Sequence, residues 1–379
     1  MLQSPHRECR LTHTSMDNLS PINASERACT FSCYQLDPTH DRRWPDFVEL
    51  HPRSSVFHSV GWLKALRRTY GYEPVVFTTS PPTSPLKNGL VFCRVKSRLT
   101  GNRLVSLPFS DHCELLCDSA EDLAFLVRYL QSTLEPQNCR YLEVRPVNGN
   151  FGCCEPEWRF TRSSVYFFHN LDLRPPLDEL FRDFDRDCVR RRIQRADRAG
   201  LIEKYGRSEG LLREFYKLFV ATRGRHRLPP IPYAWFRNLV LCQGQALEIR
   251  LAYKERTPVA GILVLRFKNI VYYKYGGSDA NFNSLGATPW LLWRAIAAAK
   301  SSGAVEFDMG RTDMDNPGLL AFKNHWVPQP TQLVYFRFPE TKPLDAPGEW
   351  KLRFAKRVFS CMPKNLLRLT GRLIYRHIG

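Results

Sequence analysis

The sequence predicts an α/β fold in which one order of elements occurs twice along the chain. Both halves contain helical patterns, a strand hairpin, a further strand, a helix and a closing strand. The two closing strands are similar stretches, Leu-Glu-Val-Arg at 142–145 and Val-Glu-Phe-Asp at 305–308. Because alternating strands and helices are typical of α/β sheets, and because the order repeats, we expect two similar units packed side by side.

The helices and strands of the first unit are predicted between residues 57 and 146. A helical pattern at 57–70 is followed by a strand hairpin, at 73–79 and 89–95, with a long Pro/Ser-rich loop, and by a third strand at 103–108. Ser119, with Asp122 three residues later, gives a start like a capping box, and apolar residues from Leu123 to Leu130 line the helix that follows. A strand at 141–146 closes the unit.

The second unit repeats these elements. Apolar residues from Leu177 to Cys188 have helical spacing, and a second helical run covers 211–223. Three strand patterns follow, at 247–253, 259–267 and 270–275. Thr288-Pro289 then predicts a helix start, with a hydroxyl cap and a proline in the first turn, and Gly303 predicts the helix end.

The last strand of the second unit carries the most informative polar residues. Asp308, Gly310 and Arg311 are expected to leave its carboxyl end, where open α/β sheets place their ligands. The segment Phe322-Lys323-Asn324-His325-Trp326 follows closely. We therefore expect the working end of the protein here. The predicted organisation is a polar tail at 1–44, a first unit at 45–165, a second unit with the site at 166–340 and a basic amphipathic segment at 341–379.

Composition limits the classes of function. The chain has 379 residues, of which 43% are hydrophobic, and it shows neither a run of 18 apolar residues nor an apolar secretory signal. A cytoplasmic protein is therefore expected. The 12 cysteines include no pair with zinc-finger spacing, so we expect free thiols and no metal. The formal net charge of +18 favours an anionic partner, which can be a phosphate-bearing donor, a nucleic acid or a membrane face.

The C-terminal segment 341–379 contains nine Lys/Arg interleaved with Leu, Phe, Ile and Tyr, and it is interrupted by Pro363 and Gly371. Such a basic amphipathic segment can lie on an anionic bilayer, at the inner face of the membrane for a cytoplasmic protein. It can equally pack on the protein with its arginines in water. The sequence leaves both alternatives open.

Several motifs, in order, resemble the FemAB-type branch of the GNAT acyltransferase superfamily, including its acetyltransferase-like relatives beside envelope and exopolysaccharide genes. The resemblance covers about residues 55–340. It rests on Leu-Pro-Phe-Ser at 107–110, the basic helix at 190–196 ending at Gly200-Leu201, the helix and turn from 215 to Pro229, Pro-Val-Ala-Gly at 258–261, Asp-Met-Gly-Arg at 308–311 and Phe-Lys-x-x-Trp at 322–326.

This resemblance implies two tandem GNAT-like (acyl-CoA N-acyltransferase) domains that transfer an acyl or aminoacyl group to an amine. The donor is acyl-CoA, such as acetyl-CoA, in ordinary GNAT enzymes and aminoacyl-tRNA in the FemAB branch. The implied acceptor is a glycan or a lipid-linked precursor of the cell envelope or of an exopolysaccharide. tRNA is thus one partner to consider, and DNA is not expected. One alternative function is that of an aminoacyl-tRNA-dependent peptidyl-type transferase of the peptidoglycan-bridge kind. The other is that of a non-catalytic, basic, membrane-peripheral protein.

The resemblance also suggests roles for individual residues. It places Lys323 beside the oxyanion that forms during acyl transfer, where a cation lowers the barrier. Arg311 can bind a phosphate or carboxylate through two parallel hydrogen bonds, or form a salt bridge with Asp308 or Asp313. Asp308 is a candidate base for the incoming amine, and Tyr275 is a candidate hydrogen-bond partner of the acceptor. Without an activated nucleophile, we expect direct attack by the amine.

Two segments are candidate anion-binding sites. GNAT enzymes hold pyrophosphate on a glycine-rich loop before a helix, and the corresponding loop here contains Asn283, Gly286 and Thr288 but only one glycine of the signature. The other segment is the arginine-rich helix, which contains Arg191, Arg192 and Arg195. We expect both segments to bind anionic groups of the donor.

Overall fold

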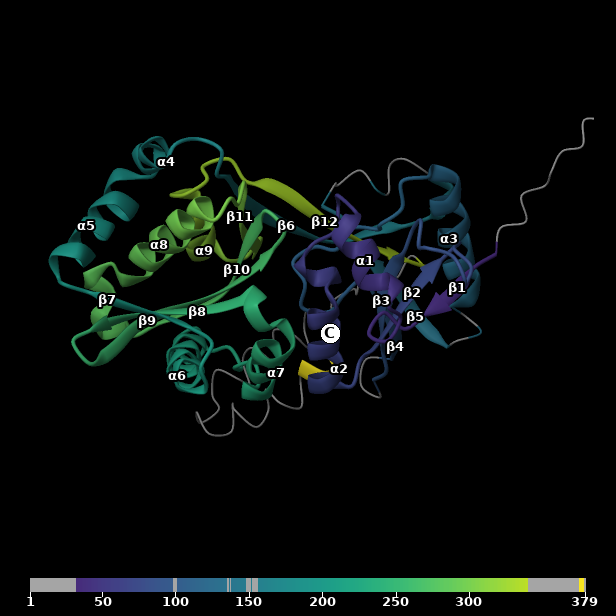
Figure 1. Cartoon of the computed structure of the whole chain (residues 1–379), viewed down its shortest axis with the longest axis horizontal. Helices are drawn as coiled ribbons and strands as arrows, with labels where there is room; N and C mark the ends of the chain where they lie inside the picture. Colours follow the sequence, from purple (N-terminus) through teal and green to yellow (C-terminus); the bar gives the residue numbers. More distant parts are fainter. Residues whose placement is uncertain are drawn as a thin grey trace, which may run out of the picture. The chain divides into compact units, whose positions relative to one another are not determined.

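The computed structural model describes residues 32–97, 101–134, 136, 138–147, 151, 156–339 and 375–377. Its strands form one sheet in the order β1-β2-β3-β4-β5-β12-β6-β11-β10-β9-β8-β7 (Figure 1). Their bounds are β1 Tyr34–Leu36, β2 Glu73–Thr78, β3 Leu90–Val95, β4 Asn102–Val105, β5 Cys139–Val144, β6 Thr161–Asp172, β7 Ile202–Gly206, β8 Leu247–Lys254, β9 Thr257–Phe267, β10 Ile270–Ser278, β11 Glu306–Asp313 and β12 Thr331–Phe338.

The described helices flank this sheet, so the predicted α/β class is confirmed. They are α1 Arg43–Leu50, α2 Val60–Tyr70, α3 Ala120–Thr133, α4 Leu177–Asp183, α5 Arg191–Arg198, α6 Glu209–Arg225, α7 Tyr233–Gln243, α8 Ala287–Ser301 and α9 Pro317–Asn324. A π-helical turn, η3 at Arg186–Arg190, leads into α5, and a 3-10 turn, η5 at Ala280–Leu285, leads into α8. No helix of the described residues is long and apolar enough to cross a membrane.

The second half is a three-layer structure, because its strands are apolar on both faces. Alternate residues of β9 enter different cores: Leu263 and Leu265 pack with α6 and α7, whereas Ile262 and Val264 pack with α5 and α8. Figure 1 shows α8 on one side of β8 and β9 and α6 with α7 on the other. The first of these cores continues into the first half, where the Trp62 ring of α2 lies 5.2 Å from the Trp235 ring of α7.

Strand β12 joins the two halves of the sheet. It follows every other strand in sequence, yet it lies between β5 and β6 and is antiparallel to both. Its Val334 and Phe336 complete the core under α3 in the first half. The boundary predicted near residue 165 therefore falls within β6, and the sheet runs through it without a break. The exact domain limits stay a prediction.

The structure corrects two further details of the sequence analysis. Residues 34–36 and 43–44, assigned to the polar tail, belong to β1 and α1; residues 1–31 lie outside the described part. Helix α8 begins one residue before Thr288, and its N-cap is Gly286, with φ of 76° and no side-chain cap. By contrast, Ser119 caps α3 as predicted by accepting from the Asp122 amide, because this signal is local.

The C-terminal turn packs on the body of the protein. Tyr72 donates its hydroxyl to the Tyr375 carbonyl at 2.9 Å, and Arg103 donates to the His377 carbonyl at 2.7 Å. The Tyr375 hydroxyl contacts the Pro229 carbonyl at 3.0 Å. These contacts favour packing for the last turn, while the rest of the basic segment predicted at 341–379 lies outside the described residues.

Gly277 in β10 allows the closest approach between the sheet and α6. A Cβ at this position would lie 2.6 Å from the Phe219 amide nitrogen, and the backbone of α6 cannot move aside locally. Gly277→Ala should therefore lower the free energy of unfolding by about 3 kcal/mol, the upper range for overpacking. Gly224→Ala is the matched control in α6, because a Cβ there meets no atom within 4 Å. It should raise stability slightly. Equal effects of both substitutions in chemical denaturation would contradict this interpretation.

Candidate functional site

The two central strands β10 and β11 separate at the centre of the second half. They are parallel neighbours over only three pairs, from Ile270↔Glu306 to Tyr272↔Asp308. Beyond these pairs, β10 continues beside β9 to Ser278, and β11 continues beside β6 to Asp313. Gly310, with φ of 72°, lies in the irregular part of β11 between Asp308 and Arg311. Asp308 and Gly310 therefore lie within a distorted strand rather than beyond its end.

A loop from the first half brings Asp111 and His112 to this separation. The loop contains the Leu-Pro-Phe-Ser motif, and its Leu107 and Phe109 both have φ of 62°, a region that side chains rarely adopt. Arg145 stabilises the turn by donating to the Leu107 carbonyl at 2.8 Å. Asp111 then lies so near β11 that a Cβ at Gly310 would be 3.1 Å from its Oδ2, so this position favours glycine.

Asp111 forms an ion pair with a buried lysine of β10. Lys274 Nζ donates to Asp111 Oδ2 at 2.7 Å, and it lies 5.1 Å from the centre of the Phe57 ring and 5.8 Å from that of Trp62. Burial raises the pKa of Asp111, but the charges of Lys274 and Arg311 outweigh it, so the pKa is lowered overall. Burial lowers the pKa of Lys274, and Asp111 only partly offsets this effect.

Arg311 is the most accessible cation of the group, with 30% of its side chain exposed. Its Nη1 donates to the Tyr335 hydroxyl at 2.7 Å, and its guanidinium lies 4.2 Å from the centre of the Tyr166 ring. Its Nε is 3.9 Å from Asp111 Oδ1, which is an ion pair without a hydrogen bond. The two tyrosines therefore orient a guanidinium that keeps donors for a further anion.

Both carboxylate oxygens of Asp308 have hydrogen-bond partners. His112 Nε2 lies 2.9 Å from Oδ2, and the Gly310 amide donates to Oδ1 at 2.6 Å. The sequence analysis considered a salt bridge from Asp308 to Arg311, but the structure pairs Asp308 with His112 instead. This histidine comes from the first half, so sequence spacing gave no indication of the contact.

Lys323, in α9, is 3% exposed and binds the distorted part of β11. Its Nζ donates to the Gly310 and Arg311 carbonyls, each at 2.9 Å. Both carbonyls lie where β11 has left β10, so the lysine satisfies acceptors that a regular ladder would have paired. Burial lowers the pKa of Lys323 to about 8, against the opposing effect of Asp111 and Asp308. An ammonium has three N–H donors, of which these bonds use two.

Tyr275 belongs to an aromatic cluster next to this group. Its hydroxyl accepts from Trp235 Nε1 at 2.8 Å, and its ring packs edge-on against Phe219 and Phe236. The Lys274 ammonium lies 5.8 Å from the centre of the same ring. Burial raises the pKa of Tyr275, so its hydroxyl stays protonated at neutral pH. Tyr275 thus flanks the predicted site.

The structure brings the two predicted anion-binding segments together. Arg195 donates to the Ser284 carbonyl at 3.1 Å, so α5 covers the loop before α8. Gly286 packs on α5 so closely that a Cβ would lie 2.4 Å from the Arg192 carbonyl oxygen. The glycine is therefore required by this packing, whether or not a phosphate approaches. Arg191 pairs with Asp187 at 2.6 Å.

Asn283 and Thr288, the other two predicted residues of the loop, make few side-chain contacts. Asn283 accepts from the Ser278 hydroxyl at 3.3 Å, and Thr288 provides no cap to α8. Phosphate binding by these segments stays a prediction.

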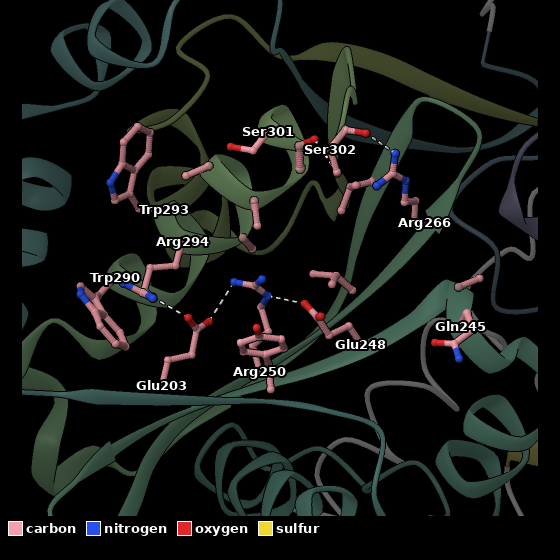
Figure 2. A pocket seen from close by; sticks show the side chains of 18 of the residues that line it. Glu203, Gln245, Glu248, Arg250, Arg266, Trp290, Trp293, Arg294, Ser301 and Ser302 are labelled. Atoms are coloured by element: carbon pink, nitrogen blue, oxygen red, sulfur yellow. Dashed lines mark hydrogen bonds and ion pairs between the residues drawn. The ribbon is translucent and has the colours of Figure 1, made fainter.

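A separate pocket of about 810 Å³ lies between α8 and strands β7 to β9 (Figure 2). Four of its charged side chains pair among themselves: Glu203 binds both Arg250 and Arg294, and Arg250 also binds Glu248. Asp197 accepts from the Trp290 ring nitrogen, and Arg266 donates to the Ser302 carbonyl. Trp290 and Trp293 line its other side. Because its charges are already compensated, we assign the candidate site to the β10–β11 separation.

Asp111, His112, Lys274 and Tyr335 were missed by the sequence analysis. Lys274 could have been suspected, because a lysine between tyrosines in a strand predicted to be buried needs a partner. Asp111 and His112 directly follow the Leu-Pro-Phe-Ser motif, which was recognised without them. Their pairing across the halves has no local signal.

Comparisons with known proteins agree with this architecture. Residues 185–324 match the model of the acetyltransferase (GNAT) domain. The crystal structure of FemX is similar with a TM-score of 0.64 and 14% identity, covering 83% of this chain and 98% of that one. A tandem GNAT protein from the clavulanic acid biosynthesis pathway gives 0.51 and 11%, with coverages of 81% and 97%.

A third similar structure is the C-terminal domain assigned to a lysylphosphatidylglycerol synthetase from Agrobacterium fabrum. Its TM-score is 0.52 at 13% identity, covering 84% of this chain and 96% of that chain. No curated protein sequence matches the chain. The comparisons confirm, at the level of domain and fold, the resemblance to FemAB-like GNAT proteins and the tandem GNAT-like architecture.

Proposed function

We propose that this protein, which contains a GNAT domain within a FemX-like fold, transfers an acyl or aminoacyl group to an amine on a cell-envelope or exopolysaccharide precursor. The observation that carries this proposal is the group of charges where β10 and β11 separate. Lys274, Arg311 and Lys323 place three cations there, against the two buried carboxylates of Asp111 and Asp308. The carboxylate of Asp313 also acts on Arg311 and Lys323, but it is exposed at the end of β11, where solvent screens it. Such an excess of positive charge in a low-dielectric site favours an anionic substrate and an anionic transition state.

In this proposal the amine attacks the acyl carbonyl directly, and the protein orients both reactants. The bond from the acyl carbon to the donor then breaks, and the donor leaves as the thiol of CoA or the ribose hydroxyl of tRNA, while the amine gives up a proton. Arg311 binds a phosphate or carboxylate of a substrate through its exposed edge, while Tyr166 and Tyr335 fix its plane. Lys323 stabilises the oxyanion of the tetrahedral intermediate. Because both oxygens of Asp308 are already bound, we propose that it chiefly positions His112 and β11, and that it takes up the amine proton only after rearrangement.

The donor is acyl-CoA or aminoacyl-tRNA. The GNAT domain supports the first, because acyl-CoA is the usual donor of that superfamily. The likeness to FemX, the net charge of +18 and the adjoining α5 and Asn283–Thr288 segments support the second. We place the reaction in the cytoplasm, at the inner face of the membrane for a lipid-linked acceptor.

A binding experiment separates these donors. Calorimetry with acetyl-CoA, a long-chain acyl-CoA and charged tRNA should give one clear binder, and turnover with an amine acceptor should follow. Binding of tRNA should weaken steeply with salt, whereas binding of an acyl-CoA should depend on salt far less. Arg311→Gln should weaken binding of the true donor or acceptor about tenfold or more. Arg174→Gln, an exposed arginine paired with Asp172, is the matched control.

Two results would overturn the proposal. One is equal loss of binding in both arginine variants. The other is binding of the protein to anionic vesicles without turnover of any donor, which would identify the alternative of a non-catalytic peripheral protein.

A further inference from the structure

Asp185, Cys188 and His325 bring three metal-ligand side chains together outside the site described above. Their carboxylate, thiol and imidazole ligand atoms all lie within 4.8 Å of one another. Asp185 precedes η3, and His325 follows α9, so the cluster joins two segments that are distant in sequence. The Asp185 amide also donates to the His325 carbonyl at 3.0 Å, which holds the two backbones in contact.

We propose that these three residues bind one zinc ion. A thiolate, an imidazole and a carboxylate are the ligands that zinc accepts, whereas Mg²⁺ and Ca²⁺ prefer oxygen ligands alone. Bond lengths of about 2.0–2.3 Å place neighbouring ligand atoms of tetrahedral zinc roughly 3.3–3.8 Å apart. The observed separations therefore need to contract by only about 1 Å. Water would take the fourth position.

The bonds around Asp185 leave room for the ion. Its Oδ1 accepts from the Asp187 and Cys188 amides, at 3.0 and 2.6 Å, so the carboxylate is already oriented by the start of η3. The Cys188 thiol lies within 4.8 Å of this carboxylate. Zinc would replace that thiol proton, and the proton would leave to solvent. Besides Asp185, the charges of Arg192 and Asp187 also act on the thiol, with opposite signs.

Aromatic residues adjacent in sequence to two of the ligands pack against one another. The ring of Phe184 lies 4.8 Å from that of Trp326 and 5.9 Å from that of Trp293. Phe184 immediately precedes Asp185, and Trp326 immediately follows His325, so the packing of these rings restricts both ligands. A metal site is more selective when such supporting contacts fix its ligands.

A zinc ion here would clamp α9, which carries Lys323, to the segment that leads into the arginine-rich helix α5. The proposal does not depend on the acyl-transfer reaction, because its consequence is a structural link. Sequence spacing could not predict the cluster, since Cys188 and His325 lie far apart in the chain.

The test is metal titration of the purified full-length chain after chelation. Zinc should bind with one ion per chain and raise the unfolding midpoint by roughly 4 °C at about 100 times its dissociation constant. Cobalt(II) should bind in its place and show thiolate charge-transfer absorption with strong tetrahedral visible bands. Both signals should disappear in Cys188→Ala and in His325→Ala.

The controls address folding and adventitious binding. Asp185→Asn retains a helix-capping side chain and should weaken zinc binding at least tenfold without changing the metal-free unfolding midpoint. Cys242→Ser removes another half-buried thiol and should leave both signals intact. The proposal is overturned if the wild-type chain shows neither signal, or if the Cys188 and His325 variants retain the thiolate band and the zinc-dependent shift.

Discussion

Replacing Lys323 with methionine should lower the turnover number about 100-fold or more, the effect of losing one oxyanion donor. The expected loss has two physical causes. The variant removes a cation from a buried group that also contains Asp111 and Asp308. It also leaves the Gly310 and Arg311 carbonyls without their amine, which loosens β11 where the substrates are proposed to meet. Single-turnover kinetics with the identified donor would measure the chemical step.

The loss of stability must be separated from the loss of chemistry. Leu130→Ala is a suitable control, because Leu130 is 1% exposed in the core under α3, and truncating it should cost about 2–5 kcal/mol. This control should retain its turnover number at a temperature where it is folded. If Lys323→Met also keeps its turnover number, or loses only what the Leu130 variant loses, the lysine is structural.

Removing the carboxylate of Asp111 should have the largest effect on stability. Asp111→Ala leaves the Lys274 ammonium buried without its partner, and breaking a buried ion pair in this way costs about 3–5 kcal/mol. Lys274→Met should cost a similar amount. The double variant should be more stable than the sum of the two losses predicts, by about 1–3 kcal/mol, because neither charge is then left alone. Denaturant unfolding of the four proteins measures this coupling.

The same ion pair gives a pH dependence with a definite sign. The pKa of Asp111 is lowered in the folded protein despite its burial, so the group stabilises the folded state above its ordinary pKa. That contribution should be lost as the pH falls through the lowered value, and Asp111→Ala should lack it. Additive losses in the double-variant cycle, together with an unchanged acid transition, would show that the pair does not couple.

The sequence predicted those features that depend on neighbouring residues. Runs of apolar residues located β8 and β9, and Ser119 located the start of α3. The sequence did not predict features that depend on contacts between segments distant in the chain. For Gly286 it offered only a phosphate loop as the reason for a glycine, and it missed the packing against Arg192, which by itself requires one. Asp308 was interpreted as a base or a partner of Arg311, and its contact with His112, which a loop of the other half supplies, was not predicted.

The position of Lys323 illustrates the same limit within the site. Its motif predicted a role at the working end of the protein, and the structure places it there together with Asp308 and Arg311. What the sequence could not show is that β11 is distorted at Gly310, so that backbone carbonyls need the lysine. Such contacts depend on packing between remote segments, so local sequence patterns do not predict them.

The position of β12 in the sheet determines when the sheet can be completed during synthesis of the chain. While the ribosome is still adding α4 to α9, β5 has no neighbour on its β12 side. Strand β6 lacks β12 throughout this interval and also lacks β11 until that strand has been made. Phe338, which pairs with Leu142, is added roughly 200 residues later, a delay of roughly 10–40 s at about 5–20 residues per second. Throughout that interval the nascent chain presents two open strand edges that invite pairing with other chains. The first half can therefore complete its sheet only after β12 has been added, and a chain that stops before Thr331 would keep both edges open permanently.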